Sequence, residues 1–453
     1  MKTAHRIGMF HYQLGLTDGV SLEVDKWKTV LERMGHQVQL FAGRFGADQG
    51  VLVPELYHHT PVIEEINQNV LGLSHSLTSK ALGIQIREQK EKAKAALMKA
   101  IVDNDLDLLI VDNIWSVAMN IPAAIALQEI RAELGLPAIA HHHDFYWEKR
   151  VKPDLGDPLV KEILDKDLPP KSAEIKHVVI NSLARASLEG YKRIESTIIP
   201  NVFDFEGPDW VVDSYNKDFR QAIGLNEGDI AILQATRIIP RKGIELAIDL
   251  VAELNAPHRR ALIQERGLVN GRRFTPESKI VLVLAGYDRE DLSGTYLKRL
   301  KEKAEELDVD LRHIDTLVGP ERSHLSGNKI YSFWDTYTIA DLVTYPSLWE
   351  GWGNQLLEAF RAKLPVVLFE YPVYLEDIKD KGFDVISLGS IIKSRDRLDL
   401  AEISTKILQG AADKCVGTLT DRQLRKQTVD QNYRIAKQHY SYETLENDLI
   451  PLL

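Results

Sequence analysis

Two glutamates, Glu350 and Glu358, stand at the two ends of a loop that contains glycines. The loop between them begins Gly351-Trp352-Gly353-Asn354-Gln355. A carboxylate accepts hydrogen bonds and can take two from adjacent hydroxyl groups, whereas glycine amides before a helix suit phosphate groups. A ligand that carries a diphosphate between two sugars matches glycine amides in the middle and a carboxylate at each end. The pattern therefore points to a nucleotide sugar.

The elements around this loop are predicted to be a strand, a helix and a second strand. Residues 340–344 form an apolar segment of strand length that Pro346 ends, residues 355–363 have apolar positions at helical spacing, and residues 365–369 read as a buried strand. In such a unit the loop lies at the carboxyl end of a parallel sheet, where ligands bind. Two glutamates eight residues apart occur often by chance. The prediction is specific because proline, serine, Glu-Gly-aromatic-Gly and an apolar helix follow one another in this order.

A second loop, residues 236–243, carries three cations before a glycine: Arg237, Arg241 and Lys242. It follows a predicted strand at 230–234 and precedes a predicted helix at 243–254. Arg237 and Lys242 could offset the charge of a leaving diphosphate. A basic loop is often only a solvated surface, but its place at the carboxyl end of a strand favours a binding site.

Three consecutive histidines, His141, His142 and His143, follow a predicted strand at 137–140. His141 and His143 point to the same face, so a metal site is conceivable. The chain has one cysteine, and no second histidine stands at His-x3-His spacing on a helix. We therefore expect no metal at these residues.

Alternating strand and helix patterns predict the α/β fold class with open parallel sheets. We predict a first Rossmann-like domain at 1–205 and a second at 218–431, joined by an acidic and aromatic connector. A helical segment at about 432–453 is expected to pack back on the first domain. Within the first domain, Ser21 is the predicted N-cap of a helix from Glu23 to Met34.

The composition is that of a globular protein, with 44% hydrophobic and 27% charged residues. The balance of 56 basic and 66 acidic residues gives a net charge of −10, which argues against nonspecific nucleic-acid binding. Cys415 is the single cysteine, so an intrachain disulfide is excluded, as suits a reducing cytoplasm. We see no signal-type segment in the first residues and no apolar run of the ~20 residues that a membrane helix needs. A cytoplasmic location without membrane insertion is expected.

Together these strings resemble the retaining glycosyltransferases of family 4, which carry a Glu-x7-Glu signature and have the GT-B fold. That fold implies two facing Rossmann-like domains with the active site in the cleft between them. The resemblance spans nearly the whole chain, including the loop at 15–20, the segment Ile199-Pro200-Asn201 and the terminal helix. Val202 replaces a glycine usual in the family, and Asn354-Gln355 replaces more apolar residues.

The resemblance implies a role for each matching residue. Glu358 would hold the ribose of the donor and Glu350 the hydroxyls of the transferred sugar, while His143, with His142 as the alternative, would contact the sugar near the reacting carbon. The implied catalytic residues are His143, Arg237, Lys242 and Glu350. The implied donor-binding residues are Gly19, Arg237, Lys242, Glu350, Gly351, Trp352, Gly353, Asn354, Gln355 and Glu358. The acceptor-binding candidates are Asp18, His141, Tyr146, Lys149 and Arg150.

Within the family, the strings at 17–23 and 141–148 look most like the mannosylglucosylglycerate-type synthases. This likeness implies mannose transfer from GDP-mannose to a small acidic acceptor, glucosylglycerate or its 3-phosphate, with Lys149 and Arg150 as cations for the acid. A nucleotide-sugar donor and a small acceptor are the expected partners; no tightly bound cofactor is expected, and Mg²⁺ stays open as an activator. A UDP-glucose-dependent glucosyltransferase of the same fold is the alternative.

Two alternatives belong to other classes. Gly351-x-Gly353 before a helix, with Glu370 after the next strand, partly matches a nicotinamide-binding fingerprint and hence an NAD-dependent oxidoreductase. Leu356 replaces the third glycine of that fingerprint, and the loop from Pro346 is too long for its tight first turn. A noncatalytic sugar-binding protein with two lobes would share the fold class but would not need cations beside the carboxylates.

Overall fold

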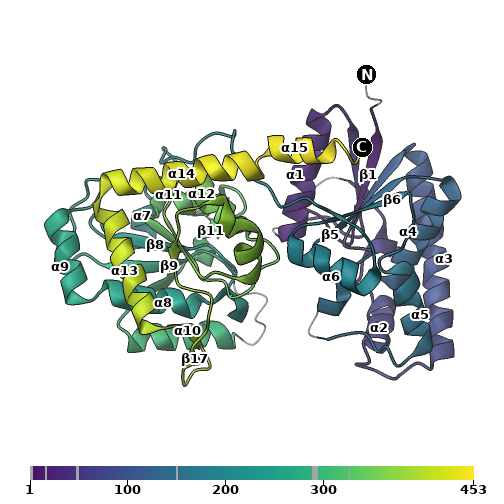
Figure 1. The fold of residues 1–453 in the computed structure, drawn as a ribbon, viewed down its shortest axis with the longest axis horizontal. Coiled ribbons are helices and arrows are strands. Elements are labelled where there is room, and N and C mark those ends of the chain that lie inside the picture. The colour runs from purple at the N-terminus through teal and green to yellow at the C-terminus, as the bar shows by residue number, and fades with distance from the viewer. Residues whose placement is uncertain (1–3, 16–17, 47–49, 149–150, 288–293, 326) are drawn as a thin grey trace. The chain divides into compact units, whose positions relative to one another are not determined.

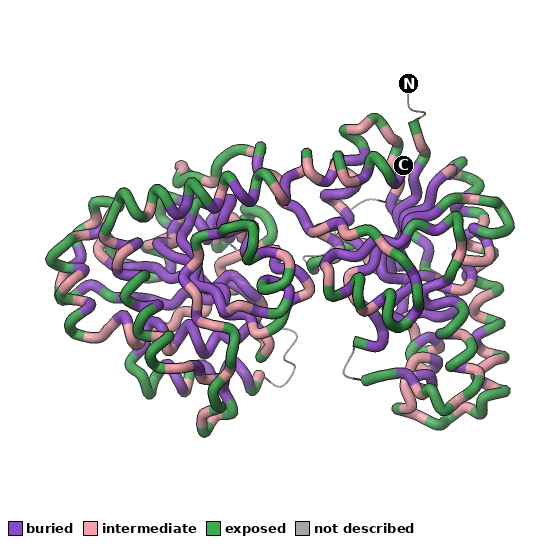
Figure 2. Tube along the Cα trace, viewed as in Figure 1, coloured by how far each residue is buried: buried purple, intermediate pink, exposed green. Residues whose placement is uncertain are grey.

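The computed structural model describes residues 4–15, 18–46, 50–148, 151–287, 294–325 and 327–453. The chain forms two compact units. The first unit comprises residues 1–202 together with residues 442–453, and the second comprises residues 203–441. Each unit is built around a parallel sheet whose central strands are buried (Figures 1 and 2).

The first unit contains a parallel sheet with strand order β3-β2-β1-β4-β5-β6-β7. The strands are β1 (Arg6–His11), β2 (Gln37–Ala42), β3 (Val51–Leu52), β4 (Leu108–Asp112), β5 (Ala138–His142), β6 (Ile175–Val179) and β7 (Thr197–Ile198). The helices are α1 (Gly19–Arg33), η1 (Pro54–Leu56), α2 (Pro61–Val70), α3 (Ser79–Asp103), α4 (Ile121–Leu134), η2 (Tyr146–Glu148), α5 (Pro158–Asp167), α6 (Ser182–Lys192) and α15 (Tyr442–Leu449).

Both faces of this sheet are covered, because successive strand residues point to opposite sides. In β4, Leu109 and Val111 belong to a core shared with α3 and α4. Leu108 and Ile110 belong to a second core shared with α1 and α15. The continuous apolar run of β4 is thus explained by burial on both faces.

Helix α1 starts earlier than the sequence predicted, at Gly19 instead of Glu23. The predicted N-cap, Ser21, is wrong, because Asp18 caps the helix. The Asp18 carboxylate accepts hydrogen bonds from the backbone N–H groups of Val20 and Ser21, each at 3.0 Å, and from the Ser21 hydroxyl at 2.7 Å. An ionised carboxylate at this place also interacts favourably with the helix dipole.

Helix α15 completes the first unit with residues from the far end of the chain. It lies beside α1 (Figure 1), and Leu445 and Leu449 are fully buried in the core that α1 lines. Arg33 of α1 forms an ion pair with Glu443 at 3.2 Å. The apolar contacts carry most of this attachment, since exposed ion pairs contribute little.

The second unit contains a sheet of parallel strands in the order β10-β9-β8-β14-β15-β16. These strands are β8 (Ile230–Gln234), β9 (Ile280–Leu284), β10 (Asp310–His313), β14 (Leu342–Tyr345), β15 (Val366–Leu368) and β16 (Ile386–Ser387). Smaller pairings involve β11 (Val318–Gly319), β12 (Ser323–Leu325) and β13 (Asn328–Ser332), and separately β17 (Ser394–Arg395) and β18 (Ala401–Glu402).

Helices cover the second sheet as they cover the first, and residues of β8, β9, α8, α10 and α13 share one core. The helices are α7 (Phe219–Ala222), η3 (Pro240–Lys242), α8 (Ile244–Leu254), α9 (Pro257–Arg266), α10 (Thr295–Glu306), η4 (Asp315–Leu317), α11 (Asp335–Ile339), α12 (Asn354–Arg361), η5 (Tyr374–Ile378), η6 (Lys379–Lys381), α13 (Thr405–Thr420) and α14 (Arg422–Tyr440). Across the described residues, no helix combines the length and the apolar composition needed to cross a membrane.

The strand orders place a topological switch point in each unit. From β1 the chain proceeds outward to β2 and β3, and then returns to β4 on the other side of β1. From β8 it proceeds to β9 and β10, and returns to β14 on the other side of β8. In open α/β sheets, ligands bind at the carboxyl ends of the strands that flank such a point. The switch points therefore identify the β1/β4 and β8/β14 edges as candidate sites.

Candidate functional site

The basic loop and the glutamate loop of the second unit follow the two strands at its switch point. Strands β8 and β14 are paired, with Val343 opposite Leu233, so the loops after them are neighbours. The Leu348 N–H donates a hydrogen bond to the Arg241 carbonyl at 2.8 Å. Gly243 has a φ of 58°, and a Cβ atom there would lie 2.3 Å from the Pro346 carbonyl oxygen. Only glycine permits this close contact between the loops.

At the centre of this contact lies the Glu350 carboxylate, which is buried together with Lys242. The Lys242 ammonium donates a hydrogen bond to Glu350, and Arg241 donates another from Nη1 at 2.9 Å. Burial alone would raise the pKa of Glu350, but the charges of Lys242 and Arg241 outweigh it and lower the pKa to about 2. Glu350 is therefore a carboxylate at neutral pH.

Three basic side chains gather at this contact: Arg237, Arg241 and Lys242. Burial lowers the pKa of Lys242, and the charges of Arg241 and Arg237 lower it further, against the opposing effect of Glu350. Arg237 thus lies close enough to act on Lys242. A cluster of basic side chains around Glu350 suits an anionic ligand such as a diphosphate.

The glycine loop ends at α12, whose first residues are Asn354 and Gln355. Gly353 has a φ of 132°, and a Cβ atom there would lie 2.3 Å from the Tyr371 hydroxyl oxygen. That hydroxyl donates to the Trp352 carbonyl at 2.7 Å, which fixes the turn. The Trp352 side chain is buried and packs edge-on against Tyr440, with ring centroids 5.3 Å apart. Trp352 therefore shapes the loop, with its ring directed into the unit.

Glu358, in the middle of α12, is buried and hydrogen-bonded. Its Oε2 atom accepts a hydrogen bond from the Tyr337 hydroxyl at 2.6 Å. Tyr337 belongs to α11 and is fully buried, and burial followed by the Glu358 charge raises its pKa well above the usual value. The tyrosine therefore stays protonated and holds one carboxylate oxygen in place. The sequence predicted Glu358 but not Tyr337, which lies on a different element.

In the first unit, the switch point gathers histidines around a buried aspartate. Asp112 ends β4 and pairs in register with His141 of β5. Asp112 Oδ1 lies 2.8 Å from His141 Nδ1 and 3.9 Å from His143 Nε2. Burial raises the pKa of Asp112 to about 7 and lowers the pKa of His141 to about 3. His142 points elsewhere, since its Nε2 lies 3.0 Å from Nδ1 of His177.

The remaining predicted residues have varied surroundings. Asp18 and Gly19 form the start of α1, and the Asp18 carboxylate is engaged in capping. Tyr146 is buried in η2, with the Lys192 ammonium 5.8 Å from its ring centroid. Asn354 and Gln355 form the first turn of α12 and are partly exposed. Lys149 and Arg150 lie outside the described residues.

Two doubly wound parallel-sheet units in one chain are the architecture of the GT-B fold class. The fold agrees with solved structures of that class. Sucrose-phosphate synthase from Thermosynechococcus elongatus superposes with a TM-score of 0.60 over 99% of this chain and 98% of its own, at 13% identity. The predicted fold class is therefore confirmed.

The family follows from sequence similarity. Residues 216–417 match the model of the family described as glycosyl transferases group 1. Two relatives are named mannosylglucosylglycerate synthase. The one from Petrotoga mobilis is 40% identical over 85% of this chain and 86% of its own, and the one from Thermotoga maritima is 37% identical over 98% of each. The chain belongs to the glycosyltransferase group 1 family.

Membership in this family makes the protein a transferase enzyme. The prediction of a glycosyltransferase is confirmed. The oxidoreductase and the noncatalytic sugar-binding protein, the alternatives from other classes, are set aside.

Proposed function

We propose that the protein transfers mannose from GDP-mannose to glucosylglycerate or its 3-phosphate, with retention of the anomeric configuration, as a family 4 enzyme. The name shared by the two relatives is the observation that supports this choice of substrates. The cationic cluster around Lys242 supports a diphosphate-containing donor independently. A UDP-glucose-dependent transfer is the alternative from the same fold.

We assign the donor to the second unit. Arg237, Lys242 and the amides of residues 351–354 would bind the diphosphate and stabilise the charge that develops on it as the sugar departs. Glu358, held by Tyr337 through one oxygen, would accept hydrogen bonds from the ribose hydroxyls with its remaining lone pairs. The sequence-based assignment of Gly19, Trp352 and Gln355 to donor binding stays part of this proposal.

Glu350 has a double role in the proposal. Its carboxylate already accepts from Lys242 and Arg241, so it orients the two cations toward the diphosphate. A carboxylate has about four lone-pair sites, and those left over would accept from hydroxyls of the transferred sugar. No protein nucleophile is required in the front-face transfer that we propose.

We assign the acceptor to the first unit. His143 directs Nε2 toward Asp112, so its Nδ1 atom is the one that we assign to the transferred sugar. Lys149 and Arg150 would bind the acidic group of the acceptor, and Asp18, His141 and Tyr146 would complete its surroundings. The buried positions of His141 and Tyr146 suggest that they act by supporting this surface.

The test is product formation with purified protein. GDP-mannose and UDP-glucose are each offered with glucosylglycerate, its 3-phosphate and a neutral glucoside of glycerol, with and without Mg²⁺. We expect a product heavier by one hexose only with GDP-mannose and an acidic acceptor, and NMR should show the α configuration of the donor retained. Transfer from UDP-glucose alone, or an inverted product, would contradict the proposal.

Donor choice is also measurable without an acceptor. Thermal unfolding is followed with GDP, UDP, ADP or NAD at millimolar concentration. A ligand at about 100 times its Kd stabilises the folded state by about 2.7 kcal/mol and raises the melting temperature. We expect GDP to have the largest effect and NAD none. A larger effect of UDP would favour the glucosyltransferase alternative.

A further inference from the structure

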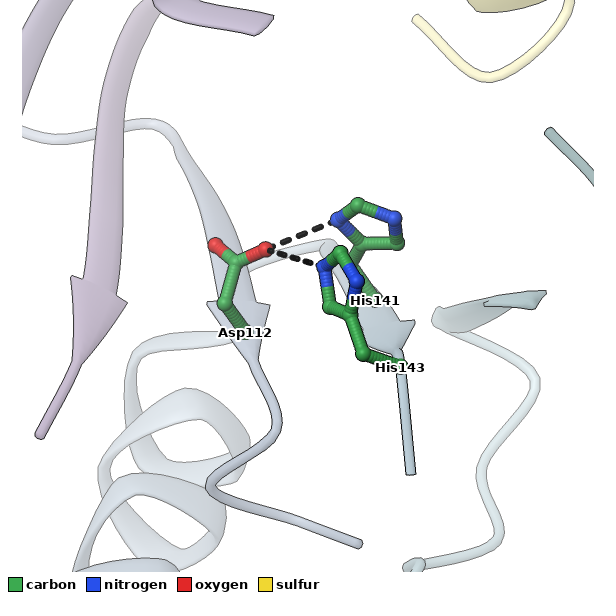
Figure 3. A group of neighbouring side chains, drawn as sticks. All are labelled: Asp112, His141 and His143. Carbon is green, nitrogen blue, oxygen red and sulfur yellow. Dashed lines mark hydrogen bonds and ion pairs between the residues drawn. The ribbon is translucent and has the colours of Figure 1, made fainter. Parts of the chain in front are cut away.

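Asp112, His141 and His143 form a compact group of potential metal ligands in the first unit (Figure 3). One ligand atom from each of the three side chains lies within 4.8 Å of the other two. The exposed fractions of these side chains are 0%, 1% and 6%. Asp112 ends β4, and the two histidines lie at the end of the neighbouring strand β5. The group thus lies at the carboxyl edge of the sheet, next to the switch point.

Hydrogen bonds within the described residues do not satisfy this group. His141 Nδ1 lies 2.8 Å from Asp112 Oδ1, but His143 Nε2 lies 3.9 Å from the same oxygen, too far for a hydrogen bond. Asp112 Oδ2, His141 Nε2 and His143 Nε2 are buried and have no hydrogen-bond partner among the residues that the structure describes. Buried polar atoms are almost always paired, so the unpaired His143 Nε2 beside Asp112 Oδ1 requires an explanation.

Asp112 also lacks a lysine or arginine partner among the described residues. The ion-pair partners of Asp112 among the described residues are His141 and His143, and no lysine or arginine lies within pairing distance. A buried carboxylate without a cation is costly, and a divalent ion would supply the charge. The two neutral imidazoles would add ligands without adding charge.

We propose that Asp112, His141 and His143 bind one divalent transition-metal ion of the Zn²⁺ type. Zn²⁺ takes nitrogen and carboxylate ligands at roughly 2.0–2.2 Å in tetrahedral sites, which places neighbouring ligand atoms about 3.4 Å apart. The observed separations of 2.8 and 3.9 Å lie on either side of that value. Three protein ligands leave a fourth position for water or a substrate oxygen. Mg²⁺ does not fit, because it prefers oxygen ligands.

Neighbouring residues contact the His141 ring and the backbone of Asp112 and His143. The indole of Trp27 stacks on the His141 ring, with centroids 4.2 Å apart. His11 Nδ1 lies 2.8 Å from the Asp112 carbonyl oxygen. The backbone N–H of His143 donates to Asn113 Oδ1 at 2.8 Å, and Asn113 adopts a positive φ of 57° that turns the chain after β4. Metal binding at these three residues is independent of which sugar the enzyme transfers. It differs from the sequence-based expectation, which was that His141 and His143 bind no metal.

The experiment measures metal binding to the full chain without an affinity tag. After treatment with a chelator and its removal, the protein is titrated with Co²⁺, Zn²⁺ and Mg²⁺, and bound metal is quantified by mass spectrometry. We expect one Zn²⁺ or Co²⁺ per chain, a visible Co²⁺ spectrum typical of four-coordinate nitrogen and oxygen ligation, a higher melting temperature with Zn²⁺, and no effect of Mg²⁺.

Variants identify the site. Asp112→Asn and His143→Gln should each weaken Zn²⁺ binding by at least about 100-fold and abolish the Zn²⁺-dependent rise in melting temperature. The control is His177→Gln, which removes a buried histidine of β6 outside the group and should bind Zn²⁺ like the wild type. Less than about 0.1 metal per wild-type chain, or an unchanged Co²⁺ spectrum in Asp112→Asn, would overturn the proposal. If a variant does not fold, the Co²⁺ spectrum and the metal content of the wild-type protein still test whether the site exists.

Discussion

The ammonium group of Lys242 is hydrogen-bonded to the carboxylate of Glu350, 108 positions away in the sequence. The contact is buried and joins the two loops at the switch point of the second unit. Each residue was predicted to act on the donor from its own loop. Their contact means that neither can be replaced without changing the charge around the other.

We predict that Lys242→Met lowers kcat by about 10²- to 10³-fold and changes KM for the donor little, because the charge on the leaving diphosphate develops in the transition state. Steady-state kinetics with varied donor concentration give both constants. A rise in KM at unchanged kcat would show that Lys242 only binds the ground state.

The double variant Lys242→Met/Glu350→Gln separates the effect of these two residues on the free energy of unfolding from their effect on catalysis. Glu350→Gln alone leaves Lys242 buried without its partner, which should destabilise the fold by about 3–5 kcal/mol. Removing both charges should recover much of that stability, because no unpaired ammonium remains, but it should recover no activity. Chemical unfolding and the same kinetic assay measure the two quantities, and an active double variant would contradict the assignment.

Tyr337→Phe tests how Glu358 is positioned. Glu358→Ala should raise KM for the donor more than it lowers kcat, since ribose binding contributes equally in the ground and transition states. Tyr337→Phe removes the hydroxyl that holds Glu358 Oε2 and should produce a smaller change of the same kind, about 5- to 10-fold in KM. An effect on kcat alone, or a larger effect than that of Glu358→Ala, would count against this arrangement.

Gly353→Ala tests the turn before α12. A Cβ atom at this position meets the Tyr371 hydroxyl, and the backbone has a positive φ of 132° that side chains rarely adopt. We expect a loss of at least about 2 kcal/mol in the free energy of unfolding and a large loss of GDP affinity. Gly410→Ala is the matched control, because Gly410 lies in α13 and no atom of the described residues lies within 4 Å of its Cβ position. That change should stabilise the helix by about 0.5–1 kcal/mol.

Acid should destabilise the protein through the buried His177. Burial lowers its pKa from 6.5 to about 4, so below pH 6.5 the unfolded chain binds a proton that the folded chain does not. The contribution of His177 to the free energy of unfolding is fully present above pH 6.5 and decreases as the pH falls toward 4. At pH 5 the loss is about 2 kcal/mol. Calorimetric melting at pH 7 and pH 5 should show a smaller decrease for His177→Gln than for the wild type. Equal decreases would refute this origin of acid sensitivity.

The sheets and the two loops of the second unit could be predicted because their signals are local. Apolar strands, a proline that ends one of them and glycines before a helix lie within a few residues of Glu350. Arg241 was recognised as a cation of the loop, but its hydrogen bond to Glu350 depends on how the two loops pack.

Contacts between side chains on different strands or helices could not be predicted from such local signals. Asp112 meets His141 only because β4 and β5 are neighbours, and their separation of 29 residues carries no pattern. Tyr337 reaches Glu358 from another helix for the same reason. The N-cap of α1 was misplaced because both Asp18 and Ser21 are good caps, and only the structure shows which amides each can reach.

The attachment of α15 to α1 has a consequence for synthesis of the protein on the ribosome. Leu445, Leu449 and Leu452 fill a core whose other buried members come from the first 202 residues, yet all of residues 203–441 are translated in between. The apolar surface of the first unit that α15 covers therefore stays exposed to solvent while the second unit is synthesised and folds. Nascent chains stopped before residue 442 should expose that surface to chaperones, and its burial has to await the synthesis of α15.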